Sequence, residues 1–304
     1  MKRVCFWWSN RSEEGLILPV YREMERSEHL EPFRLELKPL HPEILGYLYN
    51  EAYQKLMKDR PDLLFLGFDR YETLMVASAA HHLNIPIAQM EAGDISLEGS
   101  WDDWTRHAIT LLSDIQFCNG SEAYHRCISM LELAGKRTDL CLEVGSTALD
   151  GVEVDESLCP EEPYVLVLYN PPTRRLDLLQ EELDELERRL EAVEEYRIIA
   201  IEPNGDPGSE VIEMRAKIKW RRKFPRFTYL PTVERSKFLG LMKNCKYFIG
   251  NSSSLFKEAP AFLKEHQIIH IGVRNKGRRF LKPELGASRK IVRIIERIFQ
   301  EGKL

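Results

Sequence analysis

The stretch that decides the fold runs from Ile85 to Cys127 and reads IPIAQMEAGDISLEGSWDDWTRHAITLLSDIQFCNGSEAYHRC. Its first residues, as far as Met90, have the length and apolar character of a buried strand. The apolar run stops at Glu91-Ala92-Gly93-Asp94, and a helical pattern begins near Asp102. A carboxylate at a strand end, facing a helix that opens with acids, is a common way to build a site in an α/β protein.

The predicted helix carries Asp102, Asp103 and Arg106 near its start. Asp102 and Arg106 are four residues apart, so they share one face of the helix. Two interpretations fit this spacing. The charged residues either belong to a functional site or form a surface ion pair on a capped helix, which contributes little to stability.

Buried-type strands alternate with helical patterns through the first half of the chain. We expect strands at 3–8, 33–37, 62–67, 85–90, 115–118 and 140–144, and helices at 16–24, 41–58, 71–83 and 121–134. This alternation predicts a parallel sheet covered on both faces, with ligands bound beyond the carboxyl ends of the strands. Asp69 follows one of those strand ends. The first turn, SNRSEEG, lacks the GxGxxG dinucleotide fingerprint, but its Arg11 is a candidate to meet a phosphate.

A change in composition near the middle predicts a domain boundary. Residues 151–163, GVEVDESLCPEEP, are acidic, contain two prolines and have no period. We expect residues 1–155 to form one Rossmann-like domain and residues 156–304 a second one facing it across a cleft. The C-terminal helix is a candidate to pack back on the first domain.

The second half repeats the alternation and carries its own polar turn. Strands are expected at 164–169, 197–201, 227–230, 247–249 and 267–271, with a long helix at 176–193. After Gly250 the sequence NSSSLFKE places three serines at a helix start and Glu258 one turn later. Free N–H groups and hydroxyls at such a start suit a phosphate, although a plain serine N-cap is the alternative. The segment 272–279 adds cations.

Composition limits the class of protein. The 304 residues are 43% hydrophobic and 30% charged, with a net charge of −5, which gives no electrostatic footprint for nucleic acid. No apolar run reaches the ~20 residues of a membrane helix, and no signal-peptide pattern opens the chain, so we expect a cytoplasmic protein. Six cysteines are scattered without CxxC spacing. Reduced core thiols are the predicted state, rather than a zinc site or a disulfide framework.

Taken in order, these pieces resemble the UDP-N-acetylglucosamine 2-epimerase family, especially its hydrolysing branch in sialic-acid-type sugar biosynthesis. The matching pieces are GFDRYE from Gly67, EAGD from Glu91, DDWTRHAIT from Asp102, GSTALD from Gly145, PNGDPGS from Pro203, GNSSS from Gly250 and IGVRNKGR from Ile271. Single pieces are weak signals, but the ordered set spans nearly the whole chain.

The resemblance implies a glycosyltransferase-B-like fold that holds a UDP-sugar in the interdomain cleft. It implies removal of the proton at C2 as UDP leaves C1, followed by addition of water, or of UDP, with C2 inverted. The implied catalytic residues are Asp69, Glu91, Asp102, Asp103 and Arg106. The implied UDP-binding residues are Arg11, Asn170, Asn204, Ser252, Ser253, Ser254, Glu258, Arg274 and Arg278. No metal or redox cofactor is implied, and a homodimer is expected.

One departure from the family pattern concerns Asn170, which stands where the family has a histidine. Asparagine forms hydrogen bonds but does not titrate. Two alternatives therefore stay open beside the epimerase: a glycosyltransferase of the same fold, and a UDP-sugar-binding protein without turnover. The number of acids around Asp69, Glu91 and Asp102 argues against the transferase, because glycosyl transfer does not need them at C2.

Overall fold

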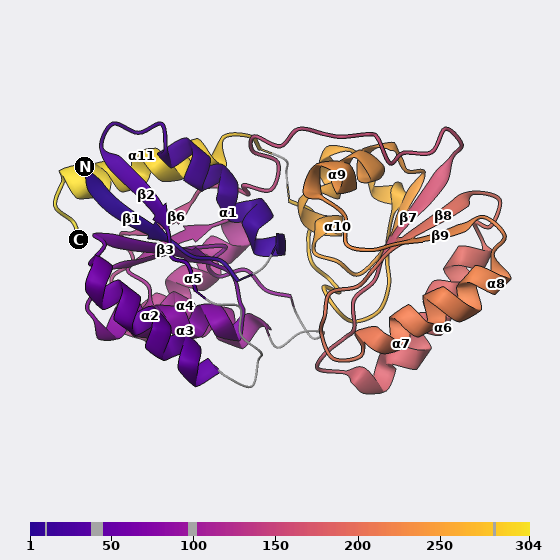
Figure 1. Ribbon diagram of the computed structural model, residues 1–304, viewed down its shortest axis with the longest axis horizontal. Coiled ribbons are helices and arrows are strands. Elements are labelled where there is room, and N and C mark those ends of the chain that lie inside the picture. The colour runs from indigo at the N-terminus through magenta and orange to yellow at the C-terminus, as the bar shows by residue number, and fades with distance from the viewer. Residues whose placement is uncertain (10, 38–44, 97–101, 282–283) are drawn as a thin grey trace. The chain divides into compact units, whose positions relative to one another are not determined.

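The computed structural model describes residues 1–9, 11–37, 45–96, 102–281 and 284–304. The chain divides into two compact units, shown in Figure 1. Unit 1 comprises Met1–Ile95, Asp102–Gly151 and Glu284–Leu304, and unit 2 comprises Ser96–Trp101 and Val152–Pro283. Each unit is an α/β domain built on its own parallel sheet, as the alternation of strands and helices predicts.

Unit 1 contains a six-stranded sheet in the order β2-β1-β3-β4-β5-β6, with all neighbouring strands parallel. Its strands are β1 (Lys2–Phe6), β2 (Leu30–Arg34), β3 (Leu63–Gly67), β4 (Ile87–Met90), β5 (Ile115–Cys118) and β6 (Cys141–Glu143). Its helices are α1 (Arg11–Met24), α2 (Leu45–Asp59), α3 (Tyr71–His82), α4 (Asp102–Leu112), α5 (Ser121–Leu133) and α11 (Ala287–Gln300).

Both faces of this sheet are buried, which explains the nearly continuous apolar strands. Val4 and Phe6 of β1 pack in one cluster with residues of α1 and α11. Cys5 and Trp7 point the other way, into a cluster with α2 and α3. This alternation follows from the two-residue period of a strand. Figure 1 shows α1 and α11 on one side of the sheet and α2, α3 and α4 on the other.

The C-terminal helix belongs to unit 1. Asp150 holds its start, because the two carboxylate oxygens accept hydrogen bonds from the backbone N–H groups of Gly286 and Ser288, each at 2.6 Å. A carboxylate at this position satisfies N–H groups that have no partner inside the helix. The apolar face of α11 then packs against α1 through Ile291, Ile295 and Ile298.

Unit 2 has a five-stranded parallel sheet in the order β11-β10-β7-β8-β9. Its strands are β7 (Tyr164–Leu168), β8 (Arg197–Ile201), β9 (Phe227–Leu230), β10 (Tyr247–Gly250) and β11 (Ile268–His270). Its helices are α6 (Leu179–Glu191), α7 (Ser209–Met214), α8 (Arg221–Lys223), α9 (Arg235–Asn244) and α10 (Ser254–Lys257). A π-helical segment, Arg215–Trp220, joins α7 to α8, and short 3-10 turns cover Leu176–Leu178, Ala259–Ala261 and Glu265–Gln267.

Two predicted elements need correction. The strand expected at 33–37 lies at Leu30–Arg34, and β2 is the edge strand of the sheet. An edge strand pairs on one side only and therefore tolerates Pro32, which hid the strand in the sequence. The helix expected at 41–58 is described from Leu45 to Asp59, and residues 41–44 lie outside the described part of the chain.

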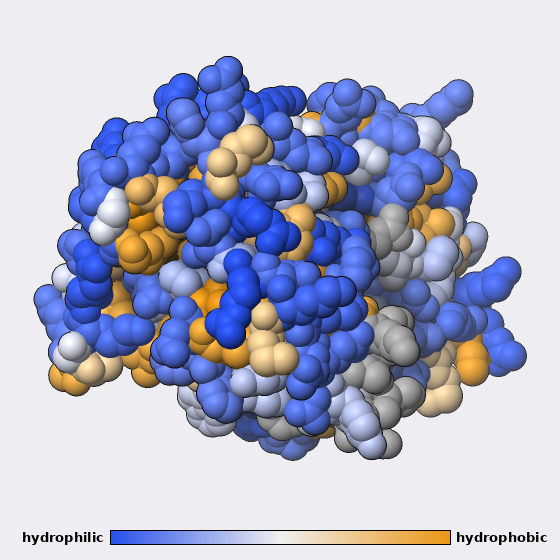
Figure 2. Space-filling model, turned by 60° about the vertical axis from the view of Figure 1, so that its left-hand side comes forward, coloured by the Kyte–Doolittle hydropathy of each residue, from blue (hydrophilic) through white to orange (hydrophobic). Residues whose placement is uncertain are grey.

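The surface shown in Figure 2 is mostly hydrophilic, with hydrophobic residues in small separate groups. Among the described residues, no helix combines the length and the apolar character that crossing a membrane requires.

Candidate active site

The carboxyl edge of the unit 1 sheet brings the predicted catalytic residues together. The strand order reverses between β1 and β3, and polar residues follow the neighbouring strand ends. Asp69 comes after β3, Glu91 directly after β4 and Asn119 directly after β5. Ligands of open α/β sheets bind at this kind of reversal.

Arg106 is the centre of this group. Its side chain is buried, with 4% of the residue exposed, and it contacts the carboxylate of Asp69. Its Nη1 donates to the Asp103 carboxylate at 3.1 Å and to the carbonyl oxygen of Asp94 at 2.7 Å. A planar guanidinium can hold several acceptors at once. The interpretation of these charges as a surface ion pair on a capped helix is therefore wrong, because Arg106 is buried and joins three segments of unit 1.

A buried polar network fixes the helix turn that carries Arg106. Gln89 of β4 donates from Nε2 to the Arg106 carbonyl oxygen at 3.2 Å. Its Oε1 accepts from the Thr110 hydroxyl at 2.7 Å, and that hydroxyl also donates to the Arg106 carbonyl at 2.9 Å. Gln89 and Thr110 are fully buried. Such a network orients the guanidinium without contacting the carboxylates.

The charges around Arg106 favour its cationic form. Burial lowers the pKa of Arg106, but the carboxylates of Asp69, Asp94, Asp103 and Asp102 act more strongly in the opposite direction, so the pKa is raised. The same surroundings have the opposite effect on the pKa of the neighbouring His107. Burial, and then the positive charges of Arg106 and Arg126, lower its pKa to about 4, so this imidazole is neutral at pH 7.

Glu91 has an unusual backbone. Its φ is 59°, in the left-handed region that residues other than glycine rarely adopt, and only 3% of the residue is exposed. Asn119 donates from Nδ2 to Glu91 Oε2 at 2.5 Å. Strain of this kind, held by a buried hydrogen bond, occurs most often where a side chain must be aimed for function.

Glu13 is a further carboxylate at this edge that the sequence did not single out. It lies in the first turn of α1, and its Oε2 accepts from both the backbone N–H and the hydroxyl of Ser9, each at 2.6 Å. Burial raises the pKa of Glu13 to about 7, against the two hydrogen bonds from Ser9, and the nearby charge of Asp69 adds to the increase. Glu13 therefore titrates near neutral pH.

A second polar group lies at the carboxyl edge of the unit 2 sheet, where the strand order reverses between β7 and β10. Asn251 follows β10, and its side chain makes two hydrogen bonds to the backbone of Asn170, each of 2.8 Å. Asn170 Oδ1 accepts from the Asn204 N–H at 2.9 Å. Gly250 allows this approach, because a side chain there would meet the Leu168 carbonyl oxygen at 1.9 Å.

Arg274 is tied to the same edge. Its Nη1 donates to the Pro171 carbonyl at 2.9 Å and to the Asp206 carboxylate at 3.0 Å. Asn204 also donates to Asp206, at 2.6 Å. Arg278 lies farther along the loop and donates to Asn275 Oδ1 at 3.1 Å. Arg274 is thus a buried, oriented cation that pairs with Asp206.

The helix predicted to begin at the serines is a single short turn. The helix α10 covers four residues, and the Ser252 hydroxyl accepts from the N–H of Ser254 at 3.3 Å and from its hydroxyl at 2.8 Å. Ser253 is exposed. Glu258 is 4% exposed and pairs with Arg235 at 2.9 Å through Oε1. Its Oε2 has no hydrogen-bond partner among the described residues.

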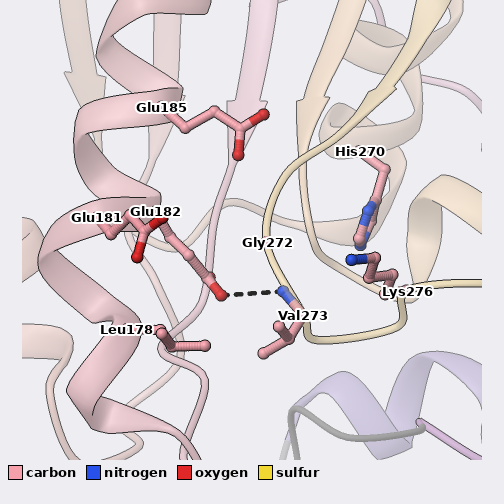
Figure 3. Close-up of a pocket in the computed structure, with 8 residues that line it drawn as sticks. All are labelled: Leu178, Glu181, Glu182, Glu185, His270, Gly272, Val273 and Lys276. Carbon is pink, nitrogen blue, oxygen red and sulfur yellow. Dashed lines mark hydrogen bonds between the residues drawn. The ribbon is translucent and has the colours of Figure 1, made fainter.

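A pocket of about 320 Å³ lies between α6 and the segment that ends β11. Figure 3 shows Glu181, Glu182 and Glu185 on the α6 side. His270 and Lys276 lie opposite them. Glu182 accepts from the Val273 N–H at 2.9 Å and from the Tyr169 hydroxyl at 2.6 Å. It therefore anchors the turn that carries Arg274.

Each unit gathers its own share of the predicted residues. Unit 1 holds Asp69, Glu91, Asp102, Asp103 and Arg106; unit 2 holds Asn170, Asn204, Ser252, Ser253, Ser254, Glu258, Arg274 and Arg278. Arg11 begins α1, and its side chain lies outside the described part of the structure. The residues that sequence reasoning missed are Glu13, Gln89, Asn119, Glu182, Asp206, Arg235 and Asn251. Glu13, Asn119, Asp206 and Asn251 stand beside a predicted strand end or turn, which was a weak signal, whereas Gln89 and Glu182 lie inside predicted elements and gave none.

Two Rossmann-like units, each with polar residues at the carboxyl edge of a parallel sheet, define a glycosyltransferase-B-like protein. A family model described as UDP-N-acetylglucosamine 2-epimerase matches residues 39–302, and the chain belongs to this family. The solved UDP-GlcNAc 2-epimerase from Neisseria meningitidis, bound to UDP-GlcNAc, superposes with a TM-score of 0.77 at 13% identity, covering 98% of this chain and 100% of that one. The likeness confirms the fold, and the match to the family model confirms the family resemblance read from the sequence.

Two relatives show how far the sequence similarity extends. A UDP-N,N'-diacetylbacillosamine 2-epimerase (hydrolyzing) from Legionella pneumophila is 28% identical over 254 residues, which cover 78% of this chain and 62% of the relative. A UDP-N-acetylglucosamine 2-epimerase from Neisseria meningitidis is 30% identical over 209 residues, which cover 66% of this chain and 54% of the relative. The chain matches less than two thirds of the length of either one.

Proposed function

We propose that this protein is a hydrolysing 2-epimerase that acts on UDP-N-acetylglucosamine or on a closely related UDP-activated 2-acetamido sugar. In this reaction a base removes the proton from C2 while the C1–O bond to UDP breaks, which leaves a sugar with a C1–C2 double bond. Water then adds its hydroxyl to C1 and a proton to the opposite face of C2. The products are UDP and the 2-epimeric free sugar.

The observation that carries this proposal is the set of carboxylates arranged around Arg106. Asp69 and Asp103 contact the guanidinium, and Glu91 is held in a strained backbone at the next strand end. Proton removal and return at C2 need acidic and basic groups whose pKa values differ. We assign proton transfer to Asp69 and Glu91. Arg106, with Asp102 and Asp103, positions the sugar and its carboxylates.

We propose that UDP binds to the second domain, residues 156–304, and that the first domain, residues 1–155, supplies the chemistry. Glu258 supports this assignment, because its buried Oε2, which has no hydrogen-bond partner among the described residues, suits a ribose hydroxyl. Arg274, Arg278 and Arg11 are assigned to the diphosphate, together with Ser252, Ser253 and Ser254. Asn170 and Asn204 shape the turn beside it. We expect a homodimer, which light scattering would test.

A cytoplasmic location is part of the proposal. All six cysteines are free thiols, and five of them are buried, which suits a reducing compartment.

Product analysis tests the proposed reaction. Purified protein is incubated with UDP-N-acetylglucosamine, with and without a sugar acceptor, and products are identified by NMR. Release of UDP with the 2-epimeric free sugar in both samples supports the proposal. Transfer of the sugar only when acceptor is present would assign a glycosyltransferase. Binding of the UDP-sugar without any product would assign a binding protein, which Asn170 in place of the family histidine makes the relevant alternative.

A further inference from the structure

Three cysteines from three successive elements of the chain meet in the interior of unit 1. Cys118 ends β5, Cys127 lies in α5 and Cys141 begins β6. Their sulfur atoms all lie within 4.8 Å of one another, and those of Cys118 and Cys141 are 3.8 Å apart. The three residues are 0%, 0% and 3% exposed. We call this set the thiol cluster.

The spacing of the thiol cluster fits a single bound centre. Two sulfurs bonded to one centre at about 2.3 Å lie roughly 3.8 Å apart at a tetrahedral angle and roughly 3.4 Å apart at the narrower angles of a pyramidal trivalent centre. The sulfurs of Cys118 and Cys141, 3.8 Å apart, need to close only slightly to reach the shorter separation. Cys118 and Cys141 come from neighbouring strands and Cys127 from the helix packed beside them, so rigid elements hold all three ligands. Thiolates select soft, thiophilic ions.

The surroundings decide which charge the centre carries. The thiol cluster packs with Ala92, Ala123 and Leu131, and Tyr124 and Ile128 lie at its margin. An uncompensated charge in such apolar surroundings is costly. Three thiolates around a monovalent ion leave a charge of −2, and around a divalent ion −1, whereas a trivalent centre is neutral. Neutrality therefore favours a trivalent thiophile.

We propose that the thiol cluster is a binding site for one trivalent thiophilic centre, of the arsenic(III) or antimony(III) class, held by three sulfur bonds. With arsenous acid the step is a condensation. Three S–H and three As–OH bonds break, three S–As bonds form, and each thiol proton leaves with one hydroxide as water. Arsenic stays in the trivalent state, so no oxidant or reductant is needed.

The thiol cluster also supports the turn that carries Glu91. A Cβ atom placed on Gly93 would lie 3.0 Å from Cys127 Cβ and 2.1 Å from the Ala123 carbonyl oxygen, so the turn rests directly on the start of α5. Arg126 Nη1 donates to the Gly93 carbonyl at 2.5 Å. Binding of the trivalent centre would draw Cys127 toward the other two sulfurs, and this movement would shift the part of α5 on which the Gly93 turn rests. Inhibition by arsenite is therefore expected, and this consequence alone rests on the proposed function.

Native mass spectrometry of the arsenite-treated protein, kept reduced with a phosphine rather than a thiol, tests the binding. The variants are Cys127→Ala and Cys141→Ala, and the control is Cys5→Ala, because Cys5 is equally buried in a strand of the same sheet but lies outside the cluster. Two cluster variants are used so that one can replace the other if it does not fold, as judged by circular dichroism.

Wild type and Cys5→Ala should gain one arsenic atom and lose three hydrogens, the mark of three sulfur bonds. In the cluster variants the affinity should fall by at least the 10–100-fold that loss of an outer partner alone causes. Uptake with the same affinity in Cys127→Ala or Cys141→Ala, or a wild-type adduct that has lost only two hydrogens, would overturn the proposal. Neither result depends on catalytic activity.

Discussion

The side-chain amide of Asn251 binds both backbone polar groups of Asn170. Its Oδ1 accepts from the Asn170 N–H and its Nδ2 donates to the Asn170 carbonyl oxygen, each at 2.8 Å. The anchor uses no atom of the Asn170 side chain. The backbone of this position, where the family resemblance implies a histidine, is therefore held independently of the side chain it carries. The contact from the Asn204 N–H to Asn170 Oδ1, at 2.9 Å, does depend on the asparagine side chain.

We predict that Asn170→His folds and keeps turnover. A neutral imidazole can accept the Asn204 N–H through one ring nitrogen, so the loss of stability should not exceed the roughly 0.5–1.5 kcal/mol of one hydrogen bond. The new imidazole should add its own titration near pH 6.5 to the rate profile, beyond any pH dependence that the carboxylates give wild type. Urea unfolding and rates of UDP release across pH measure both effects. Loss of turnover in a folded variant would show that Asn170 itself is required.

Glu13 should make the stability of the protein depend on pH. Its pKa is about 7 in the folded protein and about 4.5 ordinarily, so between these values the folded state holds a proton that the unfolded state has lost. The free energy of unfolding should therefore fall as pH rises from about 4.5 to 7, by about 3 kcal/mol. Glu13→Gln keeps an acceptor for Ser9 and should abolish this contribution. The free energy of unfolding of both proteins is measured by urea unfolding at pH 5 and at pH 8. The assignment would be contradicted if that free energy changed equally between the two pH values in wild type and in Glu13→Gln.

Glu91→Gln tests whether the strained carboxylate acts in proton transfer. The amide keeps the shape of the side chain but does not titrate, so kcat should fall by at least ~10²-fold while UDP affinity stays close to wild type. Glu122→Gln, at an exposed position at the start of α5, is the matched control. A variant as active as this control would remove Glu91 from the mechanism.

Glu258→Ala should weaken UDP binding by about 1–3 kcal/mol, the range for a buried hydrogen-bonding group left unpaired. Glu258→Gln separates this effect from the loss of the ion pair with Arg235, since the amide keeps an oxygen for that contact. Glu265→Ala, in an exposed 3-10 turn of the same unit, is the control. Unchanged UDP affinity by calorimetry in Glu258→Ala would assign the nucleotide to another part of the protein.

Local patterns predicted much of the fold. Buried strands such as β3 and β7 are recognisable as apolar runs, and the residues that follow them lie at the carboxyl edge of a parallel sheet by geometry alone. That geometry is why the sequence alone places Asp69, Glu91 and Asn170 at the carboxyl ends of strands. The edge strand β2 was misplaced because its composition need not be apolar.

Contacts between distant segments were the part that the sequence did not show. Gln89 reads as one polar residue in a strand, but in the structure it holds the turn that carries Arg106. Glu182 reads as one acid among many on α6, but it anchors the turn before Arg274. Cys118, Cys127 and Cys141 have no informative spacing and meet only because β5, α5 and β6 pack together. These pairings depend on packing that no local pattern encodes.

The most direct test of the central claim is deuterium incorporation at C2 in heavy water. UDP-N-acetylglucosamine is incubated with wild-type protein, and the sugar is followed by NMR while UDP release is measured in parallel. The proposed chemistry predicts one deuterium at C2 of the released sugar and one UDP for each sugar formed. Absence of deuterium at C2, with UDP-N-acetylglucosamine shown by calorimetry to be bound, would contradict proton abstraction at that carbon.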